Sequence, residues 1–340
     1  MSHAPGRHEH ANSPDNHSPP APASCGDAPN GTTRSTKHSG WRHARGPTGG
    51  VRRQQLAAWF FLLPFAVIFL TFTLYPLGYS VYLSTRQTVG TRLNVFAGAA
   101  NYLDLLHDDV FWSSLGRTVY FALVSVLVQL PTALALALLV HHRGVPGRMI
   151  FRTILFLPIL VGPVFIGVAF RRIYGVQEGA LNQCLGLLGI PAIDWLRDPD
   201  VVLNTLVLTA LWMYAGFHMV YFLAGLQGIP VELYEAAAID GANAWQRFRA
   251  VTLPGIWPIA AFLMTASTIG SFGLFDLPWV LTDRGGPGRA STTLMVYLYE
   301  RGFLAGDLGY AAAMGWLITI ILLAVSLLQL RVTRAWSDEA

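Results

Sequence analysis

The sequence predicts an all-α membrane protein with six transmembrane helices, and three observations support this fold class. Only 12% of the 340 residues are charged, whereas soluble domains carry about 25%. Apolar residues make up 53% of the chain, and its mean hydropathy is +0.44. Six long apolar segments follow a polar N-terminal region. Each can cross the roughly 30 Å of hydrocarbon in a bilayer as a helix.

The first fifty residues are rich in Pro, Gly, Ser, Asn and His and contain few large aliphatic residues. Such a segment buries too little apolar surface to offset its ordering entropy. We therefore expect residues 1–50 to form a disordered polar tail and residues 51–340 to form the transmembrane domain. The tail's histidines are irregularly spaced, and no Cys or carboxylate set completes a metal site, so we expect no metal and no cofactor. They are His3, His8, His10, His17, His38 and His43.

The apolar segments define the expected spans. Because a backbone inside the bilayer must satisfy its own hydrogen bonds, each span should be a helix even where Val and Ile are frequent. Prolines within the spans predict kinks or local unwinding, at Pro64, Pro131, Pro158 and Pro163. The expected spans cover approximately residues 56–83, 115–140, 149–172, 201–226, 256–281 and 311–331.

The distribution of Arg and Lys predicts the orientation. Arg52 and Arg53 directly precede the first span, and positive charge beside the first span favours the cytoplasmic side. With six spans, both termini are then cytoplasmic. The same orientation places residues 227–255, between spans four and five, in the cytoplasm.

Several classes of function are excluded. The net charge of +4 is not gathered in a basic and aromatic patch, so we expect no nucleic-acid partner. Lys37 is the sole lysine and is followed by His38, so the chain lacks the Gly-Lys-Ser/Thr of a phosphate-binding loop and is not itself an ATPase. It also lacks the HExxH and GxSxG motifs of membrane-embedded hydrolases.

The loop between spans four and five contains EAAAIDGANAWQRFRAVTLP, residues 235–254. Pro230 suits a first helical turn, where its missing N–H costs nothing. Glu235 falls in the early turns of the expected helix, where a negative charge interacts favourably with the helix dipole. Gly241 either ends the helix or lets a partner backbone approach closely. Tyr234 and Ile239 would be exposed on an isolated loop, which favours a partner surface.

The spacing of Glu-Ala-Ala, Gly241 and Leu253-Pro254 resembles the EAA loop of ABC importer permeases, with Val251 where Ile is usual. The resemblance implies an ABC type I importer permease-like fold with a cytoplasmic coupling helix, in the bacterial plasma membrane. In that family the glutamate pairs with a basic residue of the ATPase, and the glycine shapes the turn. The residues that the resemblance assigns to ATPase coupling are Glu235, Ala236, Ala237, Gly241, Leu253 and Pro254.

Further motifs are similar to the carbohydrate uptake branch of these permeases. The resemblance implies two ABC ATPase subunits, a homologous second permease subunit, an extracytoplasmic solute-binding protein and a sugar or polyol as cargo. One departure is an extra residue before Gly-Gly-Pro in the string LTDRGGP. The motifs are Leu155 to Pro158, Leu181-Asn182, Asp194 to Leu196, Ala224 to Pro230, Leu281-Thr282 with Gly285 to Pro287, and Gly309 to Ala313.

A sugar path needs hydroxyl partners and aromatic faces, and the resemblance to the maltose permease assigns four such positions. They are Tyr214, Phe217, Ser267 and Ser271. Other sugar-contacting positions of that permease fall at Ala210, Gly270 and Leu274, which lack its amide side chains, so the cargo is expected to differ.

Two ionisable residues near this path have competing interpretations. Asp276 lies within the predicted fifth span, towards its outer end, where it either binds a pair of sugar hydroxyls or is solvated near the outer interface. His218 is either a packing histidine or a ligand. An ion-coupled secondary transporter is the alternative function, but it would require several intramembrane ionisable residues. Asp276 is the one clear candidate.

Overall fold

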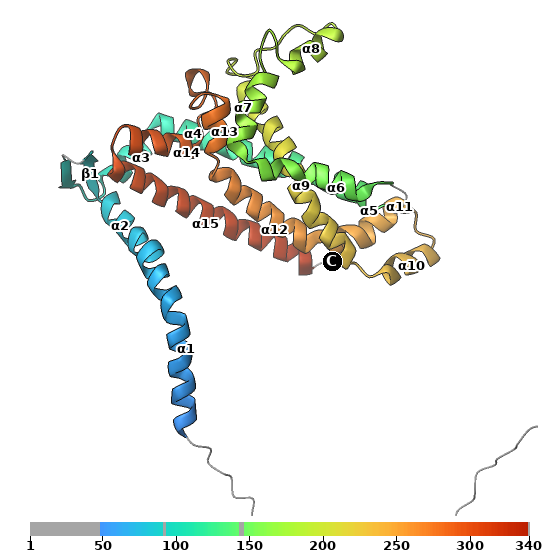
Figure 1. Cartoon of the computed structure of the whole chain (residues 1–340), viewed down its shortest axis with the longest axis horizontal. Coiled ribbons are helices and arrows are strands. Elements are labelled where there is room, and N and C mark those ends of the chain that lie inside the picture. The colour runs from blue at the N-terminus through green and yellow to red at the C-terminus, as the bar shows by residue number, and fades with distance from the viewer. Residues whose placement is uncertain (1–47, 91–92, 143–145, 339–340) are drawn as a thin grey trace, which may run out of the picture. The chain divides into compact units, whose positions relative to one another are not determined.

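The computed structural model describes residues 48–90, 93–142 and 146–338. Contacts divide the chain into two compact units, Met1–Leu62 and Leu63–Ala340. The predicted disordered tail lies outside the described residues except for residues 48–50, which begin helix α1 (Thr48–Phe69). The second unit carries most of the helices described below and is coloured from blue to red in Figure 1.

Helices of membrane-spanning length dominate the described residues. Five continuous helical stretches are long and apolar enough to cross a bilayer, and one bent pair gives a sixth if it counts as one span. Each overlaps one of the six predicted segments. The five stretches are Trp59–Ser84, Asp109–His141, Val202–Gly228, Ala244–Phe272 and Leu308–Thr333, and the pair is Arg148–Val161 with Pro163–Ile173.

The long helices, in chain order after α1, are α2 (Tyr75–Ser84), α4 (Asp109–Val124), α5 (Leu130–His141), α6 (Arg148–Val161), α7 (Pro163–Ile173), α9 (Val202–Gly228), α12 (Leu253–Phe272) and α15 (Leu308–Asp338). Short helices lie between them and at the span ends. They are α3 (Ala100–Leu106), α8 (Ala180–Leu187), α10 (Val231–Ile239), α11 (Ala244–Arg247), α13 (Asp276–Leu281) and α14 (Leu294–Tyr299), with a 3₁₀ turn at Pro287–Arg289.

Three of the spans contain a five-residue π turn that ends two residues before a proline. Proline has no N–H, and its ring clashes with the carbonyl four residues earlier. In each case that carbonyl lies within the π turn, where the wider backbone makes room for the ring. The pairs are Leu70–Leu74 before Pro76, Ser125–Gln129 before Pro131 and Phe248–Thr252 before Pro254. The unwinding predicted at Pro131 is thus a local widening, and the helix continues.

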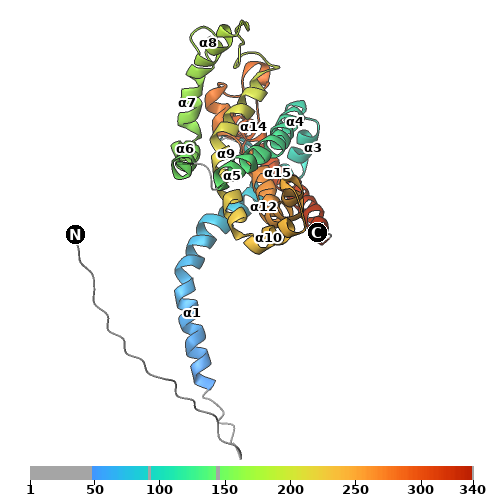
Figure 2. The same cartoon turned by 90° about the vertical axis from the view of Figure 1, so that its right-hand side faces the viewer.

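The predicted span 149–172 is broken. Helices α6 and α7 meet at 102°, and Gly162 between them has φ 85° and ψ 154°, a conformation open to few residues other than glycine. Pro163 then opens α7, where a missing N–H costs little. Pro158 lies inside α6 and does not break it. Figure 2 shows α7 leading away from α6 towards α8.

The fifth span ends earlier than the predicted residue 281. Helix α12 ends at Phe272 and is capped by Gly273, and α13 begins only at Asp276. Asp276 is exposed in the first turn of that short helix, so it does not lie within the span as predicted. Apolar residues continue past Phe272, but those of α13 pack at the end of the bundle and do not extend the span.

The all-α prediction is wrong at one place, because a two-stranded antiparallel hairpin follows α2. Strand β1 (Arg86–Val89) pairs with β2 (Leu93–Phe96), with Arg86 opposite Phe96. Asn101 in α3 fixes the hairpin to the span, because its amide donates to the carbonyls of Ser84 and Arg86 at 2.9 and 2.8 Å.

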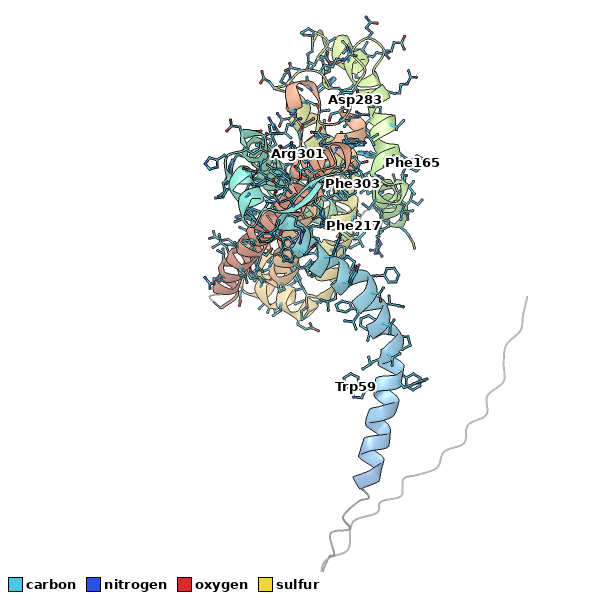
Figure 3. The ribbon with its side chains drawn as sticks, turned by 90° about the vertical axis from the view of Figure 1, so that its left-hand side faces the viewer. Trp59, Phe165, Phe217, Asp283, Arg301 and Phe303 are labelled. Carbon is cyan, nitrogen blue, oxygen red and sulfur yellow. The ribbon has the colours of Figure 1, made fainter. Side chains whose placement is uncertain are left out.

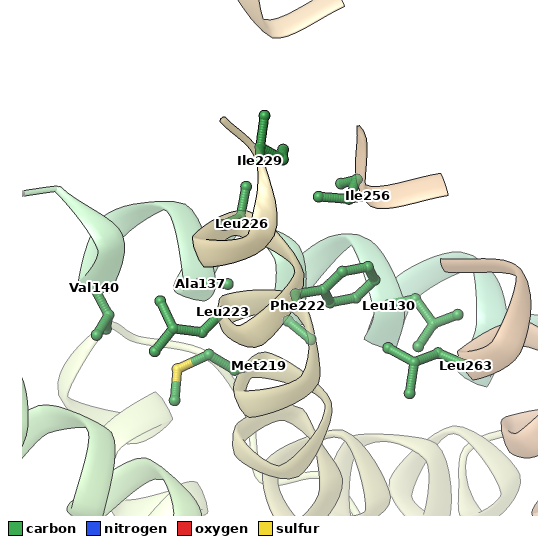
Figure 4. Packing of buried hydrophobic residues seen from close by; sticks show 11 residues of the cluster. Leu130, Ala137, Val140, Met219, Phe222, Leu223, Leu226, Ile229, Ile256 and Leu263 are labelled. Carbon is green, nitrogen blue, oxygen red and sulfur yellow. The ribbon is translucent and has the colours of Figure 1, made fainter. Parts of the chain in front are cut away.

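Helix α9 is the centre of the second unit and contacts α5, α6 and α12. In its most apolar stretch 61% of the residues are buried. Figure 4 shows the main cluster, in which Met219, Phe222 and Leu223 of α9 pack between side chains of α5 and α12. This packing holds α9 and α12 side by side, and the candidate site lies between them.

Asp108 joins three further elements at one end of the bundle. Its carboxylate caps α4 by accepting from the backbone N–H of Val110 at 2.8 Å, and it also accepts from the hydroxyls of Tyr297 in α14 and Tyr310 in α15. Burial alone would raise the pKa of Asp108, but these hydrogen bonds lower it below the usual value. Burial and Asp108 raise the pKa of Tyr297 to about 12.

We expect Asp108→Ala to destabilise the protein by about 2 kcal/mol, because it removes a helix cap and leaves two hydroxyls without an acceptor. Since folding lowers the pKa of this carboxyl, its contribution is present above the unfolded-state pKa and is lost as the pH falls through the folded-state pKa. Thermal unfolding in detergent, measured at neutral and acidic pH, tests this expectation. Asp109→Ala, which changes the exposed neighbouring carboxylate, is the control. Equal melting temperatures for the two variants would contradict the assignment.

Candidate functional site

A cavity of about 240 Å³ lies between α9, α12 and the helix formed by α4, the second π turn and α5. Four residues predicted to line a sugar path, Tyr214, Phe217, Ser267 and Ser271, line this cavity. So do the three positions without amide side chains, Ala210, Gly270 and Leu274. Asp276, the fifth predicted residue, is not among the lining residues.

Helical spacing brings these side chains together. Tyr214 lies three and four residues before the adjacent pair Phe217 and His218, and Tyr221 lies four and three residues after them, so the four share one face of α9. Their rings form a continuous wall, with centroids 5.5 Å apart for Phe217 and His218 and 5.1 Å apart for Phe217 and Tyr221. Phe217 is labelled within the helical body in Figure 3. The facing residues Ser267, Gly270 and Ser271 repeat the same spacing on α12.

His218 belongs to the cavity wall. It is 7% exposed, and its Nε2 lies 3.2 Å from the hydroxyl of Ser267. Its Nδ1 is buried and has no hydrogen-bond partner in the described residues. A buried polar atom without a partner costs free energy, so the burial of this nitrogen is not compensated within the described residues.

Sequence reasoning missed two polar residues of the cavity, Ser125 and Gln129. Both are buried within the π turn of the second span. The Gln129 amide lies 3.5 Å from the carbonyl of Ala210, a weak hydrogen bond. An amide inside an apolar run was the available signal, but its direction depends on how α5 packs against α9.

The loop between α9 and α12 folds as a short helix, a tight turn and a second helix. Helix α10 begins directly after Pro230, which is its cap and not its first residue. Gly241 ends it in a left-handed conformation with φ 78°, and the N–H groups of Gly241 and Ala242 donate to the carbonyls of Ala238 and Ala237. These two hydrogen bonds form a Schellman motif, so Gly241 acts as the helix terminator.

Most of α10 is exposed. Glu235 and Ala236 are exposed, Ala237 is half-buried, and Ile239 is 86% exposed. Glu235 makes no ion pair with any residue that the structure describes. Tyr234 differs from the expectation, because it is half-buried and its hydroxyl lies 3.0 Å from that of Thr252. This contact fixes α10 to the π turn that leads into Leu253 and Pro254.

The second helix of the loop begins with a capping box that sequence reasoning overlooked. Gln246 donates its backbone N–H to the Asn243 side chain at 2.9 Å, and Asn243 donates its own to the Gln246 side chain at 2.8 Å. The Asn-x-x-Gln spacing was the visible signal. From Ala244 the chain is helical without interruption to Phe272.

Two of the resemblance motifs build the loops at the other end of the bundle. Asn182 donates to the carbonyls of Gly175, Val176 and Ile193 and accepts from Ile193 and Trp195, so it closes the loop that contains α8. In the string LTDRGGP, four successive residues, Asp283 to Gly286, have positive φ. The extra residue is accommodated by strained backbone at Asp283 and Arg284.

These features describe a helical membrane protein, with a largely apolar cavity between its helices and a helical loop on its surface. Comparison with known proteins specifies the class. Residues 109–337 match the family described as "Binding-protein-dependent transport system inner membrane component". The chain belongs to this family of ABC importer permeases. ATP hydrolysis therefore takes place in a separate subunit, and ion-coupled secondary transport is not supported.

Two relatives and one solved structure illustrate the similarity. The chain is 36% identical to the arabinooligosaccharides transport system permease protein AraP of Bacillus subtilis (strain 168), over 89% of this chain and 95% of that protein. It is 33% identical to the lactose transport system permease protein LacF of Rhizobium radiobacter, over 83% and 96%. A bacterial ABC transporter involved in alginate import has a chain with a TM-score of 0.74 at 23% identity, covering 84% and 98%. The last comparison shows the fold.

Gly241 offers a test of the helix terminator. A Cβ there would meet open space, so Gly241→Ala should destabilise the turn only through its positive φ, by about 1 kcal/mol. We expect faster hydrogen exchange in the amides of α10. The control is Gly228→Ala, where a Cβ also meets open space but φ is not positive. Exchange that is equally fast in both variants would contradict the role of Gly241.

Proposed function

We propose that this chain is one permease subunit of an ATP-driven sugar importer, and that the cavity between α9 and α12 carries the sugar. One observation carries the proposal, namely that Tyr214, Phe217, Ser267 and Ser271 line a single cavity although they come from two helices. Aromatic rings offer flat apolar faces to the C–H surface of a pyranose, and hydroxyls orient its polar edge.

The cargo that we propose is a small saccharide. The relatives named for arabinooligosaccharides and lactose support this class. Since Ala210, Gly270 and Leu274 supply no side-chain hydrogen bonds, we propose that His218 and Gln129 provide the polar contacts. Melting temperatures of the cognate solute-binding protein with a sugar panel test the class. Stabilisation by amino acids or metal ions alone would refute the sugar assignment.

We further propose six spans with both termini in the cytoplasm, so that α6 and α7 count as one broken span. Support comes from the break at Gly162, which lies within a single apolar run, and from Arg52 and Arg53 before the first span. In this topology α10 is the cytoplasmic coupling helix.

A homologous second permease subunit is proposed to complete the cavity wall. Phe262, Ala266 and Gly270 line the cavity and are exposed. They recur every four residues on α12, so they form one stripe along the cavity's open side. Small residues at such spacing let a second helix approach closely. We propose that the partner permease closes the cavity here.

Two ABC ATPase subunits are proposed to bind the paired permeases, one at each coupling loop, with a solute-binding protein docking on the extracytoplasmic side. Glu235 and Ala236 present an exposed surface, and Gly241 fixes where that surface ends. Glu235 lacks an ion-pair partner among the described residues, which suits a pairing with a basic residue of the ATPase. Ala237, Leu253 and Pro254 complete the proposed coupling set.

Asp276 remains among the residues that we propose to contact the solute, but it lies outside the cavity. It is exposed at the start of α13, after the end of the fifth span. In the proposed topology it lies on the extracytoplasmic side, where it would meet the solute before the cavity does.

We expect Phe217→Ala to reduce sugar uptake into proteoliposomes containing the assembled transporter by about tenfold, because a stacking face worth roughly 1–2 kcal/mol is lost. Phe165→Ala makes the same change at a residue that is 71% exposed and does not line the cavity. It should leave uptake near the wild-type rate. Equal uptake by the two variants would contradict a sugar path along this cavity.

Glu235→Lys should abolish the increase in ATPase activity that sugar-loaded binding protein causes, because it places a cation against the proposed basic partner. Membrane insertion should stay unchanged, since the side chain is exposed. Glu232→Lys is the control for charge reversal on the same helix. If Glu235→Lys retains full stimulation, the coupling role of this residue is wrong.

A further inference from the structure

A second, larger groove lies at the loop end of the bundle, apart from the cavity between α9 and α12. Its volume is about 770 Å³, and it is bounded by the end of α5, the start of α6, the end of α9 and the start of α10. In Figure 1 these four elements meet on the same side of the second unit. The proposed sugar path does not use this groove.

The mouth of the groove is positively charged. Arg148 and Arg152 line it, and they lie one helical turn apart on α6. His141 lies across from them at the end of α5. No Asp or Glu is among the lining residues, and neither arginine has an ion-pair partner within the described part of the chain.

The position of the two arginines on their helix is electrostatically unfavourable. They occupy the first two turns of α6. No acidic residue lies in the first turn, and the N-cap residue, Gly147, has no side chain that could accept a hydrogen bond. The N-terminus of a helix carries partial positive charge and free N–H groups. Two cations at this end repel the helix dipole, and a bound anion would reverse the sign of that interaction.

Behind the charged mouth the groove is apolar and deep. It reaches Phe156 on α6 and Val220 on α9, each eight residues inside the end of its helix. At 1.5 Å per residue this is about 12 Å along the helix axes, into the apolar part of both spans. The remaining wall includes Val140, Leu223 and Leu226.

We propose that this groove binds an anionic phospholipid. Its phosphate would meet Arg148, Arg152 and the N–H groups at the start of α6, and its acyl chain would lie along Phe156, Val220 and Leu223. The depth of the apolar wall favours a lipid over an acidic protein surface, because a polar backbone entering the spans would lose its hydrogen bonds to water. A basic pocket at a span end is a physically sound site for such a headgroup.

Native mass spectrometry of the assembled transporter, permeases with ATPase subunits, tests the proposal. Phosphatidylglycerol and phosphatidylcholine with the same acyl chains are titrated in detergent, and inorganic phosphate is added alone in a third arm. We expect the wild type to retain phosphatidylglycerol preferentially, and Arg148→Gln with Arg152→Gln to reduce that preference about thirtyfold. The control, Arg249→Gln with Arg331→Gln, removes two exposed arginines that do not line the groove, and it should keep the preference.

Three results would overturn the proposal. One is an unchanged preference in the Arg148 and Arg152 variant. The second is stabilisation by inorganic phosphate equal to that by phosphatidylglycerol, which would indicate a free-anion site. The third is loss of ATPase subunits from the variant while the permeases keep their preference for phosphatidylglycerol, which would indicate a protein contact.

A variant that fails to assemble does not end the test. In that case the wild-type transporter is labelled with a photoactivatable phosphatidylglycerol, and the crosslinked peptides are identified. Labelling within residues 148–156 and 220–226 is expected. Labelling confined to other parts of the chain would refute the site.

Discussion

The structure depends on one constraint, that every backbone polar group inside the spans must find its partner within the protein. Proline breaks this rule locally, and a π turn precedes each of Pro76, Pro131 and Pro254, where the wider backbone makes room for the ring while the chain stays helical. Hydroxyl groups follow the same rule. Thr118 and Ser271, for example, donate to carbonyls four residues earlier in their own helices. A buried polar atom without a partner is therefore an exception that marks a candidate ligand site.

The candidate site is such a place. His218 keeps one ring nitrogen buried and unpaired, in a wall otherwise made of aromatic rings and small residues. The groove at the start of α6 shows the same principle at a helix end, because Arg148 and Arg152 lie beside free N–H groups without a neighbouring carboxylate. In both places the fold leaves polar groups without partners, and the ligand that we propose differs accordingly, an uncharged hydroxyl compound for the cavity and an anionic amphiphile for the groove.

Much of the fold could be predicted, because apolar runs of about twenty residues have few alternatives to spanning helices. The end of α10 at Gly241 was one of the two roles predicted for this glycine, because it comes shortly after the helix-forming run Ala236 to Ala238. The kink at Pro163 could be predicted from its proline, and the structure breaks the helix there, at Gly162. The end of α12 at Phe272 could not, because apolar residues continue past it. The strands β1 and β2 have four residues each, too few for an alternating pattern. Gln129 could be placed only once the packing of α5 against α9 was known.

The helix from Ala244 to Phe272 joins the surface loop to the cavity as one body. Trp245 near one end and Ser271 near the other are separated by 26 residues, about 39 Å at 1.5 Å per residue. A tilt of a rigid helix of this length at Trp245 would be carried to the serines of the cavity wall. The π turn at Phe248–Thr252, close to the loop, is where the hydrogen-bond pattern departs from that of an α-helix. The proline that requires the wider turn thus also determines where this departure lies.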